Sequence, residues 1–246
     1  MGMRARMIRI GTAGWAIPRQ HAPYFPADGS LLKRYAAVFN CAEINSTFYQ
    51  SHRAATYMRW AETVPGDFRF SVKMPKAITH ERRLIDIEAP LDAFLSEILA
   101  LGEKLGPLLV QFPGRFEFEA ERVRHFLALL RERTTAPVVC EPRHAGWFGK
   151  TATALFVGHK IVRVATDPPP VPAAALPGGW EGLAYFRLHG SPRMYFSAYE
   201  PAWLAGLARQ IAVRAEPETW CVFDNTGSGA AAENALALKR ALDPDL

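Results

Sequence analysis

Short apolar stretches alternate along the chain with longer segments in which apolar residues recur at helical spacing. Eight of the short stretches have the length and composition of β-strands: residues 7–12, 41–45, 67–73, 108–112, 138–143, 161–167, 183–190 and 220–225. The alternation of strands and helices implies parallel strands, and eight such units in 246 residues fit a closed barrel. We therefore predict an α/β fold, a TIM-barrel-like (β/α)8 closed parallel barrel, in one domain that covers residues 1–246.

One crossover helix of this barrel is predicted to be missing or vestigial. The segment between the sixth and seventh predicted strands is rich in proline: Pro168, Pro169, Pro170, Pro172 and Pro177. Proline lacks a backbone donor and breaks a helix interior, so this segment cannot form a regular helix. An open doubly wound sheet is the alternative fold, which a glycine-rich phosphate turn after the first strand would favour. Residues 11–15, GTAGW, lack the spacing of such a turn.

Polar side chains recur on one face of nearly every predicted strand, toward its carboxyl end. Because side chains alternate along a strand, the apolar residues of the other face, Val162 and Val164 among them, would meet the helices. The polar face would point into the barrel, where residues at the carboxyl ends of strands line the active site. Its members are Glu43, Asn45, Ser71, Lys73, Gln111, Glu141, Arg143, Arg163, Asp167, Tyr185, Arg187, His189 and Asp224.

So many buried ionisable groups are costly unless they pair with one another or with a ligand. The sequence therefore predicts a functional site at the carboxyl ends of the strands. A layer of ion pairs that only holds the barrel together is the alternative.

Composition narrows the class of protein. With 49% hydrophobic and 22% charged residues, the chain has the composition of a soluble globular protein. No run approaches the roughly 18 apolar residues of a membrane span, and residues 1–10 lack the apolar core of an export signal. We therefore expect a cytoplasmic protein without a membrane partner. The net charge of +5 permits an anionic partner, and Cys41, Cys140 and Cys221 are predicted to be buried in strands.

Several motifs of the chain resemble those of one known family. They are GTAGW (residues 11–15), EINSTFY (43–49), FSVKMPKAITH (70–80), GPLLVQFP (106–113), EPRHAGWF (141–148), FRLHG (186–190) and the spaced Tyr195 and Tyr199. Together they are similar to the motifs of the DUF72 proteins, also called YecE-like, whose fold is TIM-barrel-like. The resemblance implies the same barrel here and brings no established activity. The chain departs from the family pattern at Asp224, where the family usually has Asn, and at Ile17, where it usually has an aromatic residue.

The polar strand ends suggest acid/base chemistry on an anionic substrate. Glu43 and Glu141 lie on separate strands, where two carboxylates can divide the roles of general acid and general base. We predict His189 as the third catalytic residue, although a histidine at a strand end often has only a structural role. The predicted substrate-binding residues are cationic, aromatic or polar groups of the strand ends and adjoining loops: Trp15, Asn45, Tyr49, Lys73, Arg143, Trp147, Arg187, Tyr195, Tyr199, Asp224 and Asn225.

Arginine suits the recognition of carboxylate and phosphate groups, and residues 226–229 precede the last predicted helix, where barrels often bind phosphate. The sequence therefore predicts a small anionic ligand, phosphorylated or sugar-like, and an enzyme that works by acid/base or hydrolytic chemistry. This reaction would take place at the carboxyl-terminal face of the barrel.

Two other functions stay open at this point. Glu43, Glu141, Asp167, His189 and Asp224 carry donors for a divalent metal, as in a metal-assisted phosphoesterase resembling barrel endonucleases. However, metal-binding spacings such as HExxH are absent from the sequence, and the basic residues nearby would repel a cation. Alternatively, the loop aromatics could stack on bases along a basic groove, as in a nucleic-acid-binding protein. We predict no cofactor and no metal ligands.

Overall fold

A computed structural model describes residues 6–243. Residues 1–5, the first half of the segment 1–10 that argued against an export signal, therefore lie outside the described part of the chain. In the described residues, ten strands form one sheet in the order β7-β9-β10-β1-β2-β3-β4-β5-β6-β8, with every neighbouring pair parallel except β6 and β8. The strands are Met7–Ala13 (β1), Cys41–Ile44 (β2), Arg69–Lys73 (β3), Leu105–Gln111 (β4), Val138–Glu141 (β5), Ile161–Arg163 (β6), Ala165–Asp167 (β7), Gly178–Gly179 (β8), Ala184–Leu188 (β9) and Glu218–Phe223 (β10).

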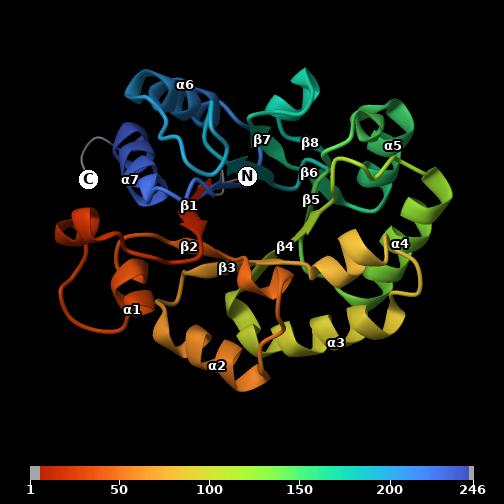
Figure 1. The fold of residues 1–246 in the computed structure, drawn as a ribbon, viewed down its shortest axis with the longest axis horizontal. Coiled ribbons are helices and arrows are strands. Elements are labelled where there is room, and N and C mark those ends of the chain that lie inside the picture. Colours follow the sequence, from red (N-terminus) through yellow and green to blue (C-terminus); the bar gives the residue numbers. More distant parts are fainter. Residues whose placement is uncertain (1–5, 244–246) are drawn as a thin grey trace, which may run out of the picture.

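The sheet curls into a nearly closed barrel (Figure 1). Strands β6 and β7 lie near opposite ends of the sheet order but follow each other directly in the chain, which brings these two ends together. Strand β6 pairs with β5, strand β7 pairs with β9, and only Val164 separates β6 from β7. The amide of Val164 donates to the carbonyl oxygen of Cys140 at 2.9 Å and so continues the pairing with β5. The predicted sixth strand therefore joins the two halves, and the prediction of a TIM-barrel-like α/β fold is confirmed.

Helices surround this barrel, as the sequence periodicity predicts (Figure 1). They are Leu31–Ala36 (α1), Ala54–Thr63 (α2), Glu88–Ile98 (α3), Ala120–Arg133 (α4), Lys150–Gly158 (α5), Pro201–Ala212 (α6) and Ala230–Leu242 (α7). Local signals explain several of their starts. The hydroxyl of Ser30 accepts a hydrogen bond of 3.2 Å from the Lys33 amide at the start of α1, and Pro201 stands in the first turn of α6.

The proline-rich segment replaces one crossover helix, as predicted. Between β7 and β9 the chain forms only a 3-10 turn, Pro172–Ala175 (η6), and the two-residue β8. Strand β8 reaches β6 through Gly179, which has a φ of 74°, and a Cβ at this position would lie 2.6 Å from the carbonyl oxygen of Ile161. A cavity of about 360 Å³, lined by residues of β7, β9 and α6, lies beside this substitute for a helix.

Two apolar clusters hold the barrel, one outside its wall and one inside. The outer cluster packs strand residues such as Ile44, Val110 and Phe186 against the helices. The inner cluster comprises Cys41, Leu109, Val139, Val162, Val164, Leu183, Tyr185, Trp220 and Val222. The three cysteines are buried in strands, as expected.

The predicted strand faces are wrong for the sixth strand. Val162 and Val164 lie inside the barrel, and Arg163 lies outside with its guanidinium 5.1 Å from the centre of the Phe148 ring. Asp167 shares the outer face with Ala165, which belongs to the outer cluster. Val162, Arg163 and Val164 do alternate in polarity, but here the polar side chain faces outward and the apolar side chains fill the barrel. Alternation therefore separated the two faces without showing which one turns inward.

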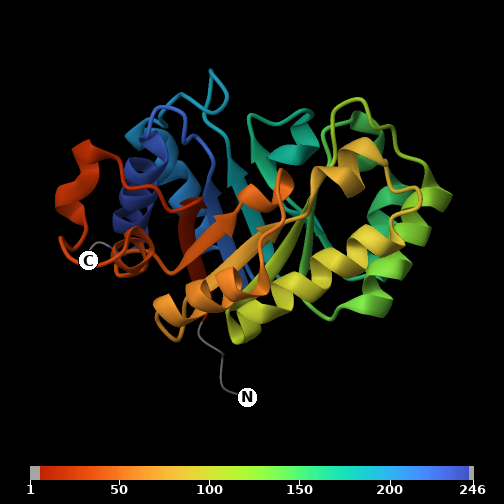
Figure 2. The same ribbon diagram turned by 60° about the horizontal axis from the view of Figure 1, so that its bottom comes forward.

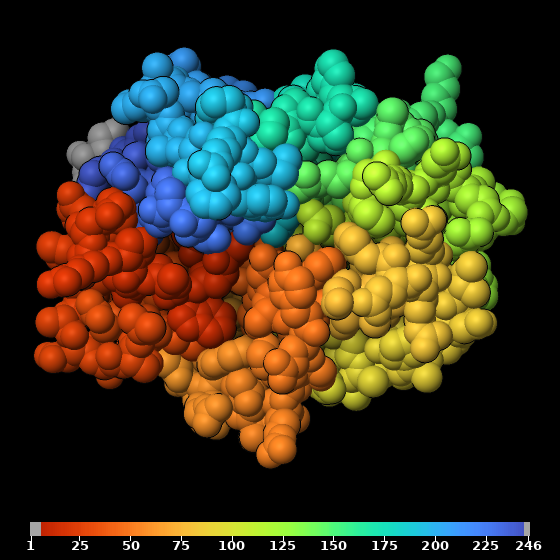
Figure 3. All heavy atoms as spheres, in the orientation of Figure 1, coloured from red at the N-terminus to blue at the C-terminus, as the bar shows by residue number. Residues whose placement is uncertain are grey.

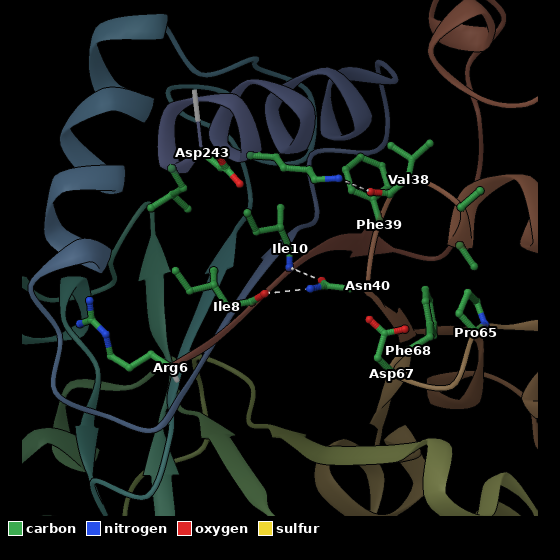
Figure 4. A pocket seen from close by; sticks show the side chains of 14 residues that line it. Arg6, Ile8, Ile10, Val38, Phe39, Asn40, Pro65, Asp67, Phe68 and Asp243 are labelled. Carbon is green, nitrogen blue, oxygen red and sulfur yellow. Dashed lines mark hydrogen bonds between the residues drawn. The ribbon is translucent and has the colours of Figure 1, made fainter. Parts of the chain in front are cut away.

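The strands run toward the upper side of the molecule in Figure 2, so this side is the face at their carboxyl ends. Figure 3 looks onto the same face, where the residues after β2 (orange) and after β9 (light blue) lie in front. A cavity of about 620 Å³ lies at the opposite end, beside the starts of β1, β2 and β3 (Figure 4). There the Asn40 side chain bonds the backbone of Ile8 and Ile10, at 2.8 and 2.9 Å. This cavity is remote from the predicted site.

Candidate active site

Arg187 lies inside the barrel beside three carboxylates from three other strands. From β9, its Nε donates to Oε2 of Glu43 at 3.0 Å and its Nη2 to Oε1 at 2.8 Å. Its Nη1 donates to Oε2 of Glu141 at 3.1 Å, and Nη2 lies 2.8 Å from Oδ2 of Asp224, just after β10. Arg187, Glu43 and Glu141 are fully buried, and Asp224 nearly so. Charges this deep are tolerated only when they are paired and hydrogen-bonded, and the planar guanidinium pairs with all three acids.

These charges fix one another's protonation state. Burial alone would lower the pKa of Arg187, but the three carboxylates raise it well above its usual range. Burial by itself would raise the pKa of Glu141, yet Arg143, Arg187 and His189 hold it well below its ordinary value of 4.5. The pKa of Asp224 is also lowered, because Arg187 and His189 outweigh the effect of burial. Glu141 and Asp224 are therefore anionic at neutral pH and act as hydrogen-bond acceptors.

Tyr185, also of β9, and inward side chains of two further strands, β3 and β4, complete the buried part of the cluster. The Tyr185 hydroxyl lies 3.1 Å from Oε2 of Glu43 and 3.0 Å from Oγ of Ser71. Gln111 Nε2 donates to Oε1 of Glu141 at 2.9 Å. Each of these residues is on the face that strand alternation predicts to point inward. The carboxylate oxygens of Glu43 and Glu141 are thus all occupied by donors from the chain.

His189 contacts groups that favour opposite protonation states. Its Nδ1 lies 3.1 Å from Oδ2 of Asp224, and its Nε2 lies 2.9 Å from Nη2 of Arg143 and 3.2 Å from Oε1 of Glu141. A guanidinium can only donate and an ionised carboxylate can only accept. With one ring proton on Nδ1, Nε2 accepts from Arg143; with a second proton, Nε2 donates to Glu141. Either state has a partner, so this imidazole is placed for proton transfer.

Cationic groups lie above the buried acids, nearer to solvent. Arg143 donates through Nε to Oε1 of Glu141 at 2.7 Å, and 16% of its side chain is exposed. The ammonium of Lys73, at the end of β3, lies 4.1 Å from the centre of the Phe48 ring, and the residue is 6% exposed. Burial, followed by the nearby Arg187, lowers the pKa of Lys73 to about 8. A ligand that arrives at this face therefore meets positive charge first.

Aromatic residues cover and flank the cluster. Tyr195 lies edge-on to the His189 ring, with the ring centres 5.5 Å apart, and it is 41% exposed. Its backbone has a φ of 68°, and its carbonyl oxygen accepts from the Gly227 amide at 2.9 Å. Tyr49 is largely exposed and lies edge-on to Phe48, whereas Trp15 packs against Trp60 and Phe70 of the outer cluster and not against the charged residues. Tyr195 is thus the aromatic side chain that touches the predicted catalytic histidine.

The predicted ligand Asn45 lies at the end of β2, just before the 3-10 turn Ser46–Phe48 (η2). Its Oδ1 is buried and has no hydrogen-bond partner among the described residues. A buried oxygen of this kind favours a nearby donor that the chain does not itself supply.

Three predicted substrate-binding residues have structural positions instead. Trp147 is fully buried, stacks on Phe112 with ring centres 4.4 Å apart, and donates through Nε1 to the carbonyl oxygen of Phe116 at 2.8 Å. Neither face of its indole is open to a ligand. Trp147 was predicted to bind substrate because it follows Arg143 closely in the same sequence motif. The chain turns outward after Arg143, however, and buries the indole of Trp147 in the outer cluster.

The other two, Tyr199 and Asn225, hold the loop after β9. The Tyr199 hydroxyl donates to Oδ1 of Asp167 at 2.9 Å and accepts from the Gly190 amide at 2.8 Å. Nδ2 of Asn225 donates to the carbonyl oxygen of Ser197 at 2.9 Å. Both residues are buried and hold the segment that carries Tyr195. The buried Oδ1 of Asn225, like that of Asn45, has no hydrogen-bond partner among the described residues.

The segment before α7 does not form an open phosphate site. The amide of Gly227 donates to Tyr195, and the amide of Gly229 donates to the carbonyl oxygen of Thr226 at 3.1 Å. The adjoining cavity has a volume of about 20 Å³, enough for about one water molecule.

The charged cluster also does not fit a divalent cation. Among residues 6–243, no three or more His, Cys, Asp or Glu side chains are grouped so that they could hold a metal ion. The predicted donors Glu43, Glu141 and Asp224 surround the guanidinium of Arg187, which occupies the position that a shared cation would need.

Among residues 6–243, every helix is too short or too polar to cross a membrane.

Phe48 and His80 belong to the site although the sequence analysis did not single them out. The His80 ring lies edge-on to Phe48 with centres 4.9 Å apart, and its Nδ1 is 2.8 Å from Oγ1 of Thr79. Burial, followed by Lys73, lowers the pKa of His80. His80 lies in a turn of π-helix, Ala77–Glu81 (η3), a feature frequent at functional sites. The available signal was the long polar loop after the third strand.

Comparison with known proteins identifies the family. A family model described as "Protein of unknown function DUF72" matches residues 9–245. The UPF0759 protein YecE of Escherichia coli K12 is 31% identical over 174 residues, which cover 68% of this chain and 62% of that protein. The UPF0759 protein YunF of Bacillus subtilis 168 is 28% identical over 148 residues, or 58% of this chain and 52% of that protein. The matched region thus spans less than two thirds of either relative.

Solved structures agree with this match. A DUF72 family protein from Thermotoga maritima MSB8 has a TM-score of 0.79 and 28% identity, with 96% of this chain and 99% of that chain covered. One from Enterococcus faecalis V583 has a TM-score of 0.79 and 25% identity, with 98% and 99% covered. A GH18 chitinase from Pseudoalteromonas aurantia shares the fold alone, at a TM-score of 0.56, 10% identity, and 97% and 100% coverage. Because the family model spans almost all of its length, this chain belongs to the DUF72 family.

Proposed function

We propose that this protein is an enzyme that acts on a small anionic substrate, phosphorylated or sugar-like, by acid/base or hydrolytic chemistry. The position of His189 is the observation that carries the proposal. Its Nδ1 is oriented by Asp224, and its Nε2 lies between a donor on Arg143 and an acceptor on Glu141. An imidazole that is oriented by a carboxylate and can gain or lose a proton at its second nitrogen is a suitable general acid and base.

The surrounding groups have distinct roles in this proposal. Arg143 is partly exposed and permanently charged, so it binds the anionic group of the substrate. Glu141 anchors Arg143 and accepts from His189, whereas Glu43 acts through Arg187, which it holds with two hydrogen bonds. Tyr195 covers His189 and moves aside when substrate enters. Lys73, Asn45 and Tyr49 line the approach, and the predicted contact of Trp15 with the substrate is not part of this proposal because Trp15 packs against the outer cluster.

A thermal-shift panel of phosphosugars, nucleotides, inorganic phosphate, short DNA and divalent metals tests the proposal. A ligand that binds only the folded state raises the melting temperature. The panel is run on the wild type, on Arg143→Gln and on Arg122→Gln, which removes an arginine whose partner Glu119 is largely exposed. We expect a phosphorylated small molecule to stabilise the wild type and Arg122→Gln, and to lose this effect in Arg143→Gln.

Three other results contradict the proposal. Equal stabilisation of Arg143→Gln would place the ligand elsewhere. Stabilisation by DNA alone, with a steep loss at higher salt, would favour nucleic-acid binding instead. Once a ligand is found, His189→Gln should bind it and fail to convert it, and conversion at the wild-type rate would remove His189 from the mechanism.

A further inference from the structure

We propose that the ε-amino group of Lys73 is a nucleophile that forms an imine with an aldehyde or ketone group of the substrate. The inference rests on the proposed function and makes it more specific. The substrate class becomes an anionic carbonyl compound, such as the open-chain form of a sugar phosphate.

The position of Lys73 suits a group that must meet a substrate. It is the last residue of β3, and its side chain points into the barrel at the face where the other polar residues gather. Arg187, Glu43, Glu141 and His189 are fully buried, whereas Lys73 retains 6% exposure. The amino group therefore lies at the boundary between the charged cluster and the solvent.

Lys73 is buried, yet it lacks the partners that Lys76 and Lys239 have. Lys76 pairs with Glu81 at 3.0 Å, and Lys239 donates to the carbonyl oxygen of Val38 at 2.9 Å. Within residues 6–243, no ion pair or hydrogen bond is made by Nζ of Lys73, whose contact is the face of the Phe48 ring. An aromatic face offsets only about 1–2 kcal/mol of the lost hydration of an ammonium, so burial lowers the pKa of Lys73 and raises the share of neutral amine.

The charged groups around Lys73 partly oppose one another. Burial and Arg187 favour the neutral amine, whereas Glu43, Glu141 and Asp224 favour the ammonium. On the loop side, His80 faces the same Phe48 ring. With a pKa of about 8 in place of 10.5, roughly a tenth of Lys73 is neutral at pH 7, about 300-fold more than for an ordinary lysine. Desolvation and a neighbouring cation are the usual means by which proteins activate a lysine nucleophile.

The reaction needs no oxidant or reductant. The amine lone pair attacks the carbonyl carbon, the carbon–nitrogen bond forms as the carbon–oxygen π bond breaks, and the oxygen takes up a proton while the nitrogen loses one to give a neutral carbinolamine. The carbon–oxygen bond then breaks, the oxygen leaves as water with a second proton, and loss of the remaining nitrogen proton gives the neutral imine. Protonation of the imine would make the adjacent carbon acidic, which gives His189 a proton to remove.

Borohydride trapping tests the inference. Glyceraldehyde 3-phosphate, dihydroxyacetone phosphate and uncharged glyceraldehyde are each incubated with the protein and reduced, and the modified peptide is located by mass spectrometry. We expect one adduct, on Lys73, that is lost in Lys73→Arg and kept in Lys76→Arg, which alters an exposed lysine three residues along the chain. Its rate of formation should rise with a midpoint near pH 8. Adducts that follow surface exposure, or persist in Lys73→Arg, would overturn the inference.

A second measurement needs no variant and separates the two proposals. Competitive labelling of the wild type with trinitrobenzenesulfonate should modify Lys73 at a lower pH than Lys76, and equal pH dependence would contradict an activated amine. If a phosphorylated compound stabilises the protein through Arg143 but leaves no adduct on Lys73, the proposed function stands and the imine is wrong. If Lys73 of the wild type reacts equally with charged and uncharged aldehydes, and Arg143→Gln changes neither rate, the imine stands and the anion site is wrong.

Discussion

Arg187 and Glu43 form a two-pronged ion pair inside the barrel, with Nη2 2.8 Å from Oε1 and Nε 3.0 Å from Oε2, and both side chains are fully buried. The same guanidinium reaches Glu141 and Asp224, so one side chain from β9 neutralises acids from β2, β5 and the end of β10. This relationship makes Arg187 a structural residue first. Its sequence-based assignment to substrate binding stays a prediction.

Arg187→Met should therefore destabilise the protein strongly. The change leaves three carboxylates without their shared cation, and the loss of one partner of a buried ion pair typically costs about 3–5 kcal/mol. Urea unfolding measures the effect. Arg133→Met is the matched control, because its partner Asp92 is 57% exposed and such pairs contribute at most about 1 kcal/mol. Similar losses in both variants would contradict the central role of Arg187.

Stability should fall steeply in acid. The pKa values of Glu141 and Asp224 are lower in the folded chain than their ordinary values of 4.5 and 3.8, so the folded state binds fewer protons than the unfolded state. The stability that they contribute is fully present above these ordinary values and is lost as the pH falls through the folded values.

Melting temperatures recorded from pH 7 down to about pH 3 check this sign. Asp224→Asn, which introduces the residue that the family pattern usually has, should show a shallower decline than the wild type. Glu119→Gln alters an exposed carboxylate and should leave the profile unchanged. A wild-type profile that is flat in acid would mean that these acids are not held ionised in the folded state.

Lys73→Met should stabilise the protein at neutral pH while it removes the proposed nucleophile. The pKa of Lys73 is lowered from 10.5 to about 8, so below pH 8 the folded chain must bury an ammonium that it disfavours. Methionine fills a similar volume without that charge, and the expected gain is on the order of 1–3 kcal/mol. The gain should shrink as the pH rises from 8 toward 10.5, because the wild-type amine is then neutral in the folded state. A loss of stability at pH 7 would show that the ammonium is well accommodated.

Tyr195→Ala should expose His189 to reagents. The Tyr195 ring lies against the imidazole of His189. The loop that carries Tyr195 is held by individual backbone hydrogen bonds, such as the one from the Gly227 amide to the Tyr195 carbonyl oxygen. Modification by diethyl pyrocarbonate, followed residue by residue with mass spectrometry, should become about 10-fold faster at His189 when this cover is removed. The exposed His125 is an internal standard that should react at the same rate in both proteins. Equal rates at His189 would mean that another segment covers it.

Trp147→Ala should reduce stability and leave ligand binding intact once the variant is folded. The indole is fully buried among Phe112, Phe116 and Phe156, so its removal opens a large cavity and costs about 3–5 kcal/mol. Trp203 is 37% exposed, and Trp203→Ala should cost clearly less. Loss of binding by folded Trp147→Ala, at a temperature well below its melting point, would restore the predicted ligand contact.

Sequence patterns predicted the barrel well where the structure of a segment depends on its own residues. The prolines after Asp167 exclude a helix wherever the chain places them, and the alternation around Glu43, Glu141 and Arg187 is set by the pleat of the strand. At Val162 and Val164 the predicted face was wrong, because the polar residue between them, Arg163, faces outward, and alternation does not show which face of a strand turns inward. The motif around Trp147 could not show that the chain turns away from the barrel after Arg143.

Contacts between residues that are distant in sequence could not be predicted, because local patterns do not show which segments meet in the folded chain. The sequence places Lys73, Phe48 and His80 in three separate segments, and only the folded chain shows that Lys73 and His80 both contact the Phe48 ring. The cover of His189 by Tyr195 depends on a left-handed backbone at Tyr195, which no residue preference at that position indicates.

The guanidinium of Arg187 is covalently part of the chain that it neutralises. Its stoichiometry inside the barrel is one per molecule, whatever the surrounding solution contains, and it can be neither diluted nor removed by a chelator. Folding alone therefore brings the cation of Arg187 to the three buried acids, Glu43, Glu141 and Asp224. Proteins of this design acquire a finished polar interior as soon as they are synthesised, without competing for an ion from the cell.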